Sequence, residues 1–143
     1  MTIRAPREVV FQYVTTPSSW PRWHVNSLAV RGAVDHSALP GEEIIEEIGI
    51  GRRRGVATWT VQERVEPSKW SMTGRLDAGG ESEITYSLSD RDGVTHYQRD
   101  FEYRMPNLFL QLLDRLVLRS RLEADARLSL QRLKELLEQG IEG

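Results

Sequence analysis

One histidine of this 143-residue chain lies where it could take part in chemistry. His24 directly follows the stretch SSWPRW, which carries Trp20 and Trp23. A neutral imidazole at an apolar cavity mouth could orient or deprotonate a ligand hydroxyl. The competing interpretation is a histidine at a helix end that is bonded to a backbone carbonyl, and the sequence favours this second interpretation.

Arg99 is the second candidate, because its neighbours alternate between apolar and polar. If Tyr97, Phe101 and Tyr103 face the interior of a sheet, Arg99 must face it too. A buried guanidinium needs an anion. The sequence offers as that anion a ligand carboxylate or enolate, or one of the carboxylates Glu46, Glu63 and Asp77. An ion pair or a side chain that reaches the rim is the structural alternative. His24 and Arg99 are therefore the candidate catalytic residues.

Three other patterns give weaker evidence for a functional site. The acidic run Glu42, Glu43, Glu46 and Glu47 divides between two strand faces, so we expect exposed edge charges rather than paired catalytic carboxylates. The segment GIGRRRG lacks the lysine and the following helix of a phosphate-binding loop, which leaves only a weak attraction to anionic headgroups at a hairpin tip. His36 is predicted in a loop and His96 outside the cavity. The histidines lack metal-ligand spacing, so neither a metal nor a cofactor is predicted.

Periodicity predicts two short helices, a run of strands and a long helix. The helices are expected in APREVVFQYVTT and PSSWPRW. Five strands are expected in GEEIIEEIGIG, GVATWTVQERVEP, KWSMTGRL, ESEITYSLSD and GVTHYQRDFEYRM. Short glycine-bearing links between the later strands indicate hairpins, and therefore an antiparallel sheet.

The last quarter of the chain has a helical period from Asn107 to Gln139. Its apolar stripe changes face around Val117 to Arg121, which predicts a kink or a change of packing partner there. Residues 107–118 could then move separately as a lid. The second stripe consists of Leu122, Ala126, Leu130, Leu133 and Leu137.

Bulk properties exclude several classes of protein. The length fits one domain, residues 1–143, and the net charge of −2 argues against a nucleic-acid partner. The chain has no cysteine and therefore no disulfide, and no apolar run approaches the roughly 20 residues that span a bilayer. We expect a cytoplasmic protein without stable membrane insertion, present as a monomer or a weak homodimer.

The order of these motifs resembles the START-like, or SRPBCC, superfamily, and most of all its polyketide cyclase/dehydrase-like branch. The resemblance rests on IRAPREVVFQYVTTPSSWPRWH, GRRRGVATWTVQERVEPSKW and LEADARLSLQRLKELLE. It implies an α+β helix-grip fold, in which a curved antiparallel sheet wraps around the C-terminal helix. Members usually begin with a full first strand, whereas here only Met1 to Ala5 precede the first helix, so we expect either a short opening strand or a start codon assigned too far downstream.

A helix-grip fold implies a cavity between the sheet and the closing helix. Large apolar or aromatic side chains and one arginine are the predicted ligand contacts: Trp20, Trp59, Trp70, Met72, Tyr86, Tyr97, Arg99, Phe101, Tyr103, Phe109, Leu112 and Leu116. The alternative for each aromatic residue is that it fills the core.

Three functions remain open because a fold does not determine a function. The first is binding of a small hydrophobic or amphipathic ligand, such as a lipid or a polyketide, without catalysis. The second is a polyketide cyclase or dehydratase in which Arg99 stabilises an enolate and His24 moves protons. The third is a protein-interaction module of the co-chaperone type. The sequence favours them in that order.

Overall fold

A single antiparallel sheet of seven strands organises the chain, in the order β1-β7-β6-β5-β4-β3-β2. The computed structural model describes residues 1–77, 79–104 and 119–142. Its elements, in chain order, are β1 (Thr2–Ile3), α1 (Arg7–Val14), η1 (Pro17–Ser19), α2 (Trp20–Trp23), β2 (Ser27–Gly32), β3 (Glu43–Ile50), β4 (Arg53–Val65), β5 (Lys69–Leu76), β6 (Glu81–Arg91), β7 (Val94–Arg104) and α4 (Arg119–Glu142).

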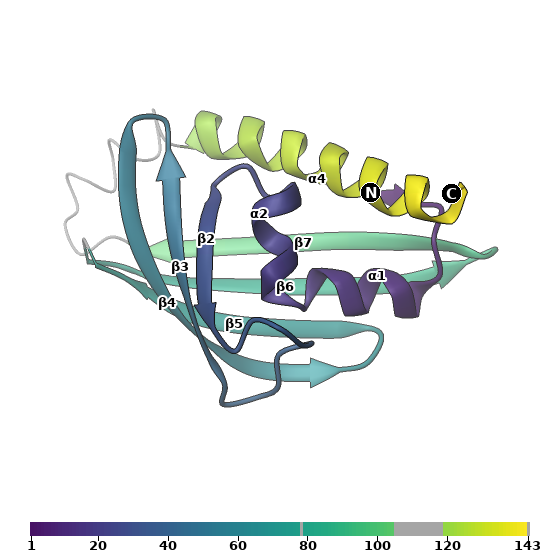
Figure 1. Ribbon diagram of the computed structural model, residues 1–143, viewed down its shortest axis with the longest axis horizontal. Helices are drawn as coiled ribbons and strands as arrows, with labels where there is room; N and C mark the ends of the chain where they lie inside the picture. Colours follow the sequence, from purple (N-terminus) through teal and green to yellow (C-terminus); the bar gives the residue numbers. More distant parts are fainter. Residues whose placement is uncertain (78, 105–118, 143) are drawn as a thin grey trace.

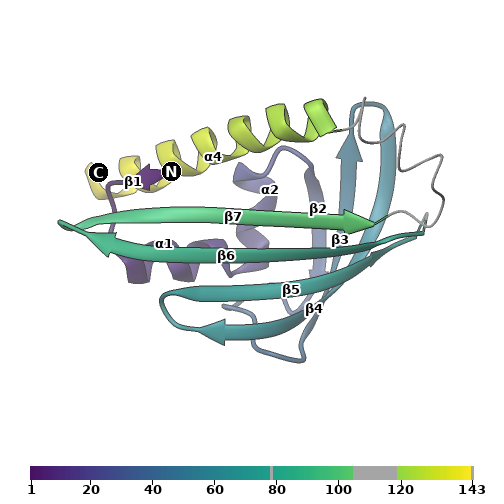
Figure 2. The ribbon, with the colours of Figure 1, turned by 180° about the vertical axis from the view of Figure 1, so that it is seen from behind.

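The helices of the described residues lie on one side of the sheet. The sheet curves strongly, α4 runs along its concave side, and α1 and α2 pack on that same side (Figures 1 and 2). Contacts join α2 to both β2 and α4, and α1 to both β6 and β7. The predicted α+β arrangement is therefore confirmed, including the two short helices near the start of the chain.

The edges of the sheet differ from their prediction in one respect. The short opening strand is confirmed, because β1 has two residues and pairs with Thr95 and His96 of β7. The other edge strand, β2, was not predicted. Its segment SLAVRG has few large apolar residues and is mostly exposed, so it lacks the alternation that marks a half-buried strand.

The apolar stripe of α4 faces the sheet as predicted. Leu133 and Leu137 are buried, and Leu122, Ala126 and Leu130 are half-buried. The predicted change of face at Val117 to Arg121, and the lid formed by residues 107–118, fall wholly or partly outside the described residues.

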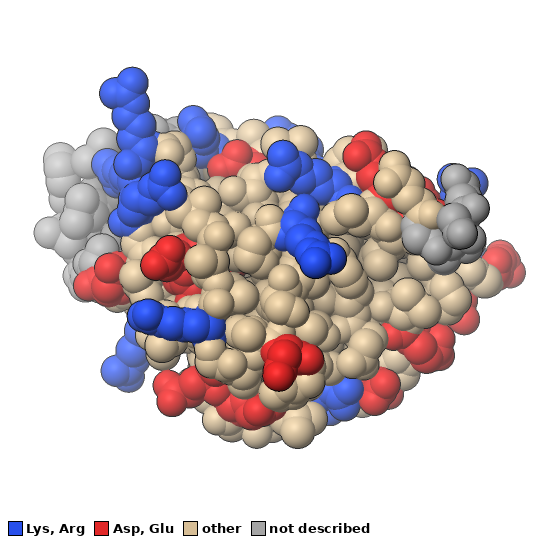
Figure 3. Space-filling model, viewed as in Figure 1, with Lys and Arg blue, Asp and Glu red and all other residues tan. Residues whose placement is uncertain are grey.

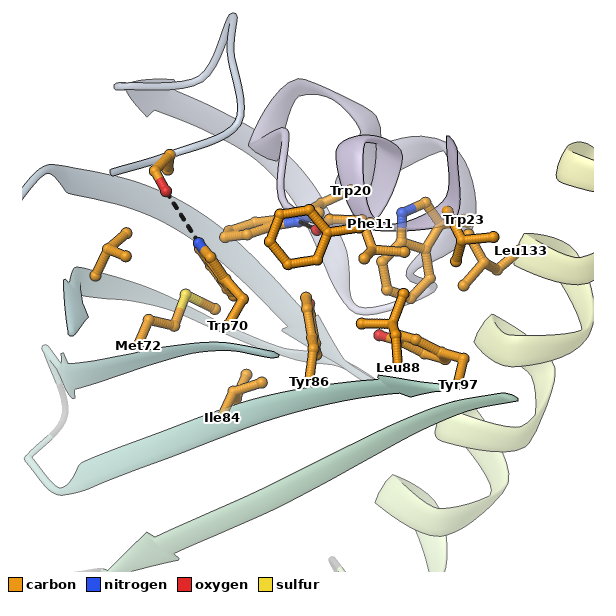
Figure 4. Close-up of a cluster of buried hydrophobic side chains, with 14 of the residues drawn as sticks. Phe11, Trp20, Trp23, Trp70, Met72, Ile84, Tyr86, Leu88, Tyr97 and Leu133 are labelled. Carbon is orange, nitrogen blue, oxygen red and sulfur yellow. Dashed lines mark hydrogen bonds between the residues drawn. The ribbon is translucent and has the colours of Figure 1, made fainter. Parts of the chain in front are cut away.

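A row of aromatic rings fills the space below α1 and α2 (Figure 4). Trp20 meets Trp70 edge-on, Trp70 stacks on Tyr86, and Tyr86 contacts Tyr97, with ring centroids 6.2, 5.2 and 5.5 Å apart. Both indoles are hydrogen-bonded, since Trp20 donates to the carbonyl of Val14 and Trp70 to that of Ala38. These bonds offset the cost of burying the N–H groups. Trp23 is also fully buried.

A glycine in β5 makes room for the Trp59 indole. Gly74 lies directly opposite Trp59 in the β4–β5 pair, and a Cβ atom at Gly74 would overlap the indole ring. The indole therefore lies flat across Gly74, with its N–H directed at Glu46 on β3.

We predict that Gly74→Ala lowers the free energy of unfolding by about 1 to 3 kcal/mol, because the indole must move out of its close-packed position. Urea unfolding measures this change. Gly55→Ala in β4 is the matched control, since an added Cβ there would meet only the carboxylate end of Asp77. Equal stability of the two variants would contradict the prediction.

Candidate functional site

His24 and Arg99 meet on the concave side of the sheet. His24 follows the last residue of α2, and its backbone N–H donates to the carbonyl of Trp20. Arg99 lies two residues after Tyr97 on β7, so both side chains leave the same face of the strand. Its Nη2 atom lies 2.8 Å from His24 Nε2, a length typical of a charge-assisted hydrogen bond.

The protonation state of His24 follows from its two contacts. Arg99 approaches Nε2, and the backbone N–H of Asn26 lies 3.2 Å from Nδ1. A neutral imidazole accepts through one nitrogen only, so the shorter contact with the charged donor fixes Nε2 as the acceptor and leaves the proton on Nδ1. Burial, and then the positive charge of Arg99, hold the pKa of His24 well below its usual range. His24 is therefore a neutral base at pH 7.

Arg99 has an unused donor beside this contact. Its Nε is buried and has no hydrogen-bond partner within the described part of the chain. Nε and Nη2 form one edge of a guanidinium, the edge that binds a carboxylate with two parallel hydrogen bonds. The guanidinium also lies 5.7 Å from the centre of the Phe101 ring, which is 38% exposed. A half-occupied anion-binding edge thus lies next to accessible aromatic surface.

Glu46 brings a carboxylate into the same interior, which corrects the prediction that the whole acidic run is exposed. Glu46 is 7% exposed because it shares the inward face of β3 with Ile44, and its Oε1 accepts from Trp59 Nε1 at 3.0 Å. Burial raises the pKa of Glu46, while the Ser27 hydroxyl, the Trp59 indole and the charge of Arg99 oppose that rise. The signal in the sequence was the position of Glu46 midway between Ile44 and Ile48, because residues two apart on a strand point to the same face.

Two phenols complete the interior polar cluster. Tyr86 lies directly opposite Arg99 in the β6–β7 pair, and Tyr97 contacts Tyr86. Burial raises the pKa of Tyr86 and raises that of Tyr97 further, so both hydroxyls stay protonated. The Tyr97 hydroxyl is buried and lies close enough to the Tyr86 hydroxyl for each phenol to affect the pKa of the other, although the two do not meet the geometry of a hydrogen bond.

Asn26 connects this cluster to α4, a role that sequence reasoning missed. Its side-chain amide donates to the carbonyl of Gly49 at 3.0 Å and to Asp125 Oδ2 at 2.9 Å. The hydroxyl of Ser129, one turn further along α4, accepts from the backbone N–H of Val25 at 3.0 Å. These bonds fix the segment that carries His24 against both the β3–β4 hairpin and the helix. Ser129 interrupts a leucine-rich stripe, which was the available signal.

The other predicted partners and histidines lie elsewhere. Glu63 pairs with Lys69 and the Asp77 carboxylate accepts from the N–H of Val56, so neither binds Arg99. His24 is not bonded to a carbonyl through its ring, because its ring contacts are with two donors. His36 lies in the β2–β3 loop between Asp35 and Glu42, and His96 is exposed, as expected.

The structure separates the predicted ligand contacts into three groups. Tyr86, Tyr97, Arg99 and Phe101 surround the polar cluster, with Trp59 joined to it through Glu46. Trp20, Trp70 and Met72 are enclosed in the core, and Trp59, Tyr86 and Tyr97 belong to the same buried cluster, so the alternative that these side chains fill the core holds for all six. The side chain of Tyr103 and the residues Phe109, Leu112 and Leu116 lie outside what the structure describes.

Surface features add little to this site. Two pockets of about 690 and 680 Å³ lie outside the cluster, one lined by outward side chains such as Thr58, Thr60 and Glu83, the other along α1 and α2.

The described residues hold no group of three or more His, Cys, Asp or Glu that could bind a metal. Within that same part of the chain, no helix has both the length and the apolar character needed to cross a membrane.

The lowered pKa of His24 predicts a pH-dependent stability. The neutral His24 contributes to the free energy of unfolding above pH 6.5, which is about the pKa of a histidine in the unfolded chain. This contribution is lost as the pH falls toward the lower pKa of His24 in the folded protein, because the unfolded chain binds the proton first. We expect His24→Gln to reduce the loss of unfolding free energy between pH 7.5 and 5.5, by at most about 1.4 kcal/mol per pH unit. Urea titrations at stepped pH measure it. His96→Gln is the control, and an unchanged slope in His24→Gln would refute the assignment.

Glu46 should behave in the opposite way. A raised folded pKa favours the fold below the unfolded value of about 4.5, and this advantage disappears as pH rises. Glu46→Gln keeps an oxygen acceptor for Trp59 and removes the buried charge, so we expect a gain of about 1 kcal/mol at pH 7 that shrinks toward pH 4.5. Thermal unfolding at both pH values tests this. The exposed Glu47→Gln should show no such gain, and a destabilised Glu46→Gln would contradict the prediction.

Comparisons with known proteins agree with this architecture. The chain resembles a START superfamily protein from Mycobacterium smegmatis, with 13% identity over 97% of this chain and 94% of that one and a TM-score of 0.70. It resembles a protein from Rhodobacter sphaeroides with 19% identity over 94% of this chain and 86% of that one and a TM-score of 0.70. It also resembles the di-domain ARO/CYC StfQ from the steffimycin biosynthetic pathway, with 16% identity over 99% of this chain and 44% of that one and a TM-score of 0.68. At such identities these likenesses show the fold alone.

Comparison of the sequence with a family model shows the family of the chain, whereas comparison with curated proteins finds no match. The family model described as "Polyketide cyclase / dehydrase and lipid transport" matches residues 1–138, which is nearly the whole chain. With a START-like fold and a polar cluster inside it, the chain belongs to the polyketide cyclase/dehydrase and lipid transport family.

Proposed function

We propose that this protein binds a small hydrophobic or amphipathic ligand between its sheet and α4, with an anionic or enol oxygen of the ligand at Arg99. The observation that carries the proposal is the unpartnered Nε of Arg99 beside the Nη2 that His24 occupies. A charged donor buried without an acceptor is costly, so this edge favours a ligand that supplies one.

The charge balance around Arg99 favours an acidic ligand over a neutral one. Its direct contact, His24, is neutral, and the buried Glu46 is not in direct ion-pair contact with it. A ligand carboxylate would accept a hydrogen bond from the free Nε and supply a nearby negative charge, and it would reach Nη2 as well only by displacing His24. This makes Arg99 the proposed determinant of ligand class.

The apolar part of the ligand would supply most of the affinity. Phe101 offers exposed aromatic surface next to the guanidinium, and the buried rings of Tyr86 and Tyr97 pack behind it on the same face of the sheet. Burial of apolar surface contributes roughly 25 cal/mol per Å², from which the costs of association are subtracted. The family description, which includes lipid transport, supports a ligand of this kind.

Native mass spectrometry of the protein purified from its own host is the direct test. A co-purifying small molecule with an acidic group and a large apolar part supports the proposal and identifies the ligand class. Protein that is free of any small molecule, and that also fails to bind the probes below, would overturn it.

Arg99→Ala should discriminate between ligand classes. We expect a fluorescent fatty acid to bind about 10 to 100 times more weakly to the variant, because a charged hydrogen bond is lost. The methyl ester of the same probe should change by less than about threefold, since it carries no anion. Fluorescence titration measures both affinities.

The control is Arg75→Ala, which removes an exposed arginine from β5. It should leave the affinity for both probes unchanged. Equal loss of acid and ester in Arg99→Ala would assign Arg99 a structural role instead of a ligand contact.

A second candidate function, cyclisation, is favoured by the convergence of a neutral base with a cation. His24 Nε2 could accept a proton from the carbon next to a ketone, and Arg99 would stabilise the enolate oxygen. The enolate carbon would then attack a second carbonyl of the same substrate and form a carbon–carbon bond. The proton would return to the new alkoxide, and later loss of water would complete a dehydration. The likeness to StfQ supports this candidate.

Turnover distinguishes the two functions. A poly-β-ketone thioester would cyclise faster with the wild type than without protein, and His24→Gln would abolish the acceleration but keep the binding. Binding without acceleration would leave carriage as the function.

A further inference from the structure

Three consecutive arginines form the tip of the β3–β4 hairpin. Gly51 and Arg52 make the turn, and Arg53 and Arg54 begin β4 opposite Ile50 and Gly49. All three arginines are exposed, and none forms an ion pair within the described residues. The neighbouring Arg121 of α4 reaches the same turn, since a Cβ on Gly51 would lie 3.7 Å from its guanidinium carbon. We call Arg52, Arg53 and Arg54 the arginine tip.

This concentration of charge contrasts with the rest of the molecule. The whole chain has a net charge of −2, yet basic side chains gather at one end, over the β3–β4 hairpin (Figure 3, upper left). Arg121 is only loosely compensated, because Asp125 lies 3.8 Å away and also accepts from Asn26. The local field is therefore positive on a molecule that is weakly negative overall.

The tip lies at the same end of the fold as the polar cluster. The side chain of Asn26 bonds the carbonyl of Gly49, three residues before Arg52, and His24 lies two residues before Asn26. Whatever binds the arginine tip is thereby close to the residues that hold the proposed ligand.

We propose that the arginine tip docks the protein on an anionic lipid surface. Consecutive strand residues point to opposite faces, so Arg53 and Arg54 diverge and Arg52 extends from the turn between them. A protein partner seated on one face of the hairpin would meet only part of this charge. A plane of anionic headgroups approached by the tip meets all three arginines at once.

The nature of this contact is electrostatic and peripheral. Each basic residue near an anionic membrane strengthens the attraction about fivefold, and the effect decays within a Debye length of about 10 Å at 0.1 M salt. The docking does not depend on the proposed ligand, so it can be tested with protein that carries none.

Sedimentation with vesicles tests the proposal. The wild type should bind vesicles of phosphatidylglycerol and phosphatidylcholine in equal parts, should not bind pure phosphatidylcholine, and should be released by 0.5 M salt, by the screening argument. The triple variant R52Q/R53Q/R54Q should bind the anionic vesicles about 100 times more weakly. Its thermal unfolding should match the wild type, because these side chains are exposed.

A triple variant with the same change in charge provides the control. R31Q/R75Q/R91Q removes three exposed arginines from β2, β5 and the end of β6. It should keep most of the vesicle binding, because only the place of the lost charges differs. Equal weakening of the two variants would show a nonspecific charge effect and overturn the proposal.

Two further outcomes also overturn it. One is a wild type that does not bind anionic vesicles at 50 mM salt. The other is a wild type that binds an acidic carrier protein through the arginine tip but ignores the vesicles, which would make the tip a protein-docking site. Retained fatty-acid binding in R52Q/R53Q/R54Q separates either outcome from a failure of the proposed function.

Discussion

A guanidinium on the concave side of the sheet is the constraint around which the interior is arranged. Strand alternation directs Arg99 inward together with Tyr97, and removal of a charge from water requires acceptors nearby. The structure supplies two neutral groups, the His24 imidazole and the Tyr86 hydroxyl, and one carboxylate at longer range, Glu46. The compensation is incomplete, because Nε keeps no partner among the described residues. An interior that is otherwise aromatic and well packed thus keeps a charged donor without an acceptor at Arg99.

The surrounding elements hold that arrangement in place. The aromatic row from Trp20 to Tyr97 fixes α2 over the sheet, and His24 directly follows the last residue of α2. Asn26 then ties the next residues to both the β3–β4 hairpin and α4. His24 is therefore positioned by packing on one side and by hydrogen bonds on the other. A movement of α4 would reach the imidazole through Asn26 and Ser129, because both contact the segment directly after it.

Binding and cyclisation make different demands on the same cluster. For binding, Arg99 must hold an oxygen and the aromatic residues must exclude water from the apolar part. For cyclisation, the lone pair of His24 must also become free, which requires the substrate oxygen to take over its contact with Arg99. The low pKa of His24 suits a neutral base but makes it a weak one. These properties agree with our preference for binding as the primary function.

The periodicity of the sequence alone determined most of the architecture: the helix pair, five of the seven strands and the inward stripe of α4. The short opening strand was expected only from the family resemblance. Alternation also indicated that Arg99 faces inward, because a side chain's face depends on local backbone geometry. The partner of Arg99 was decided only by the tertiary structure, which selected His24 over Glu63 and Asp77, residues tens of positions away on other strands. The edge strand β2 and the role of Asn26 also needed the structure, since a polar edge strand leaves no periodic signal and a hydrogen bond between distant segments leaves none at all.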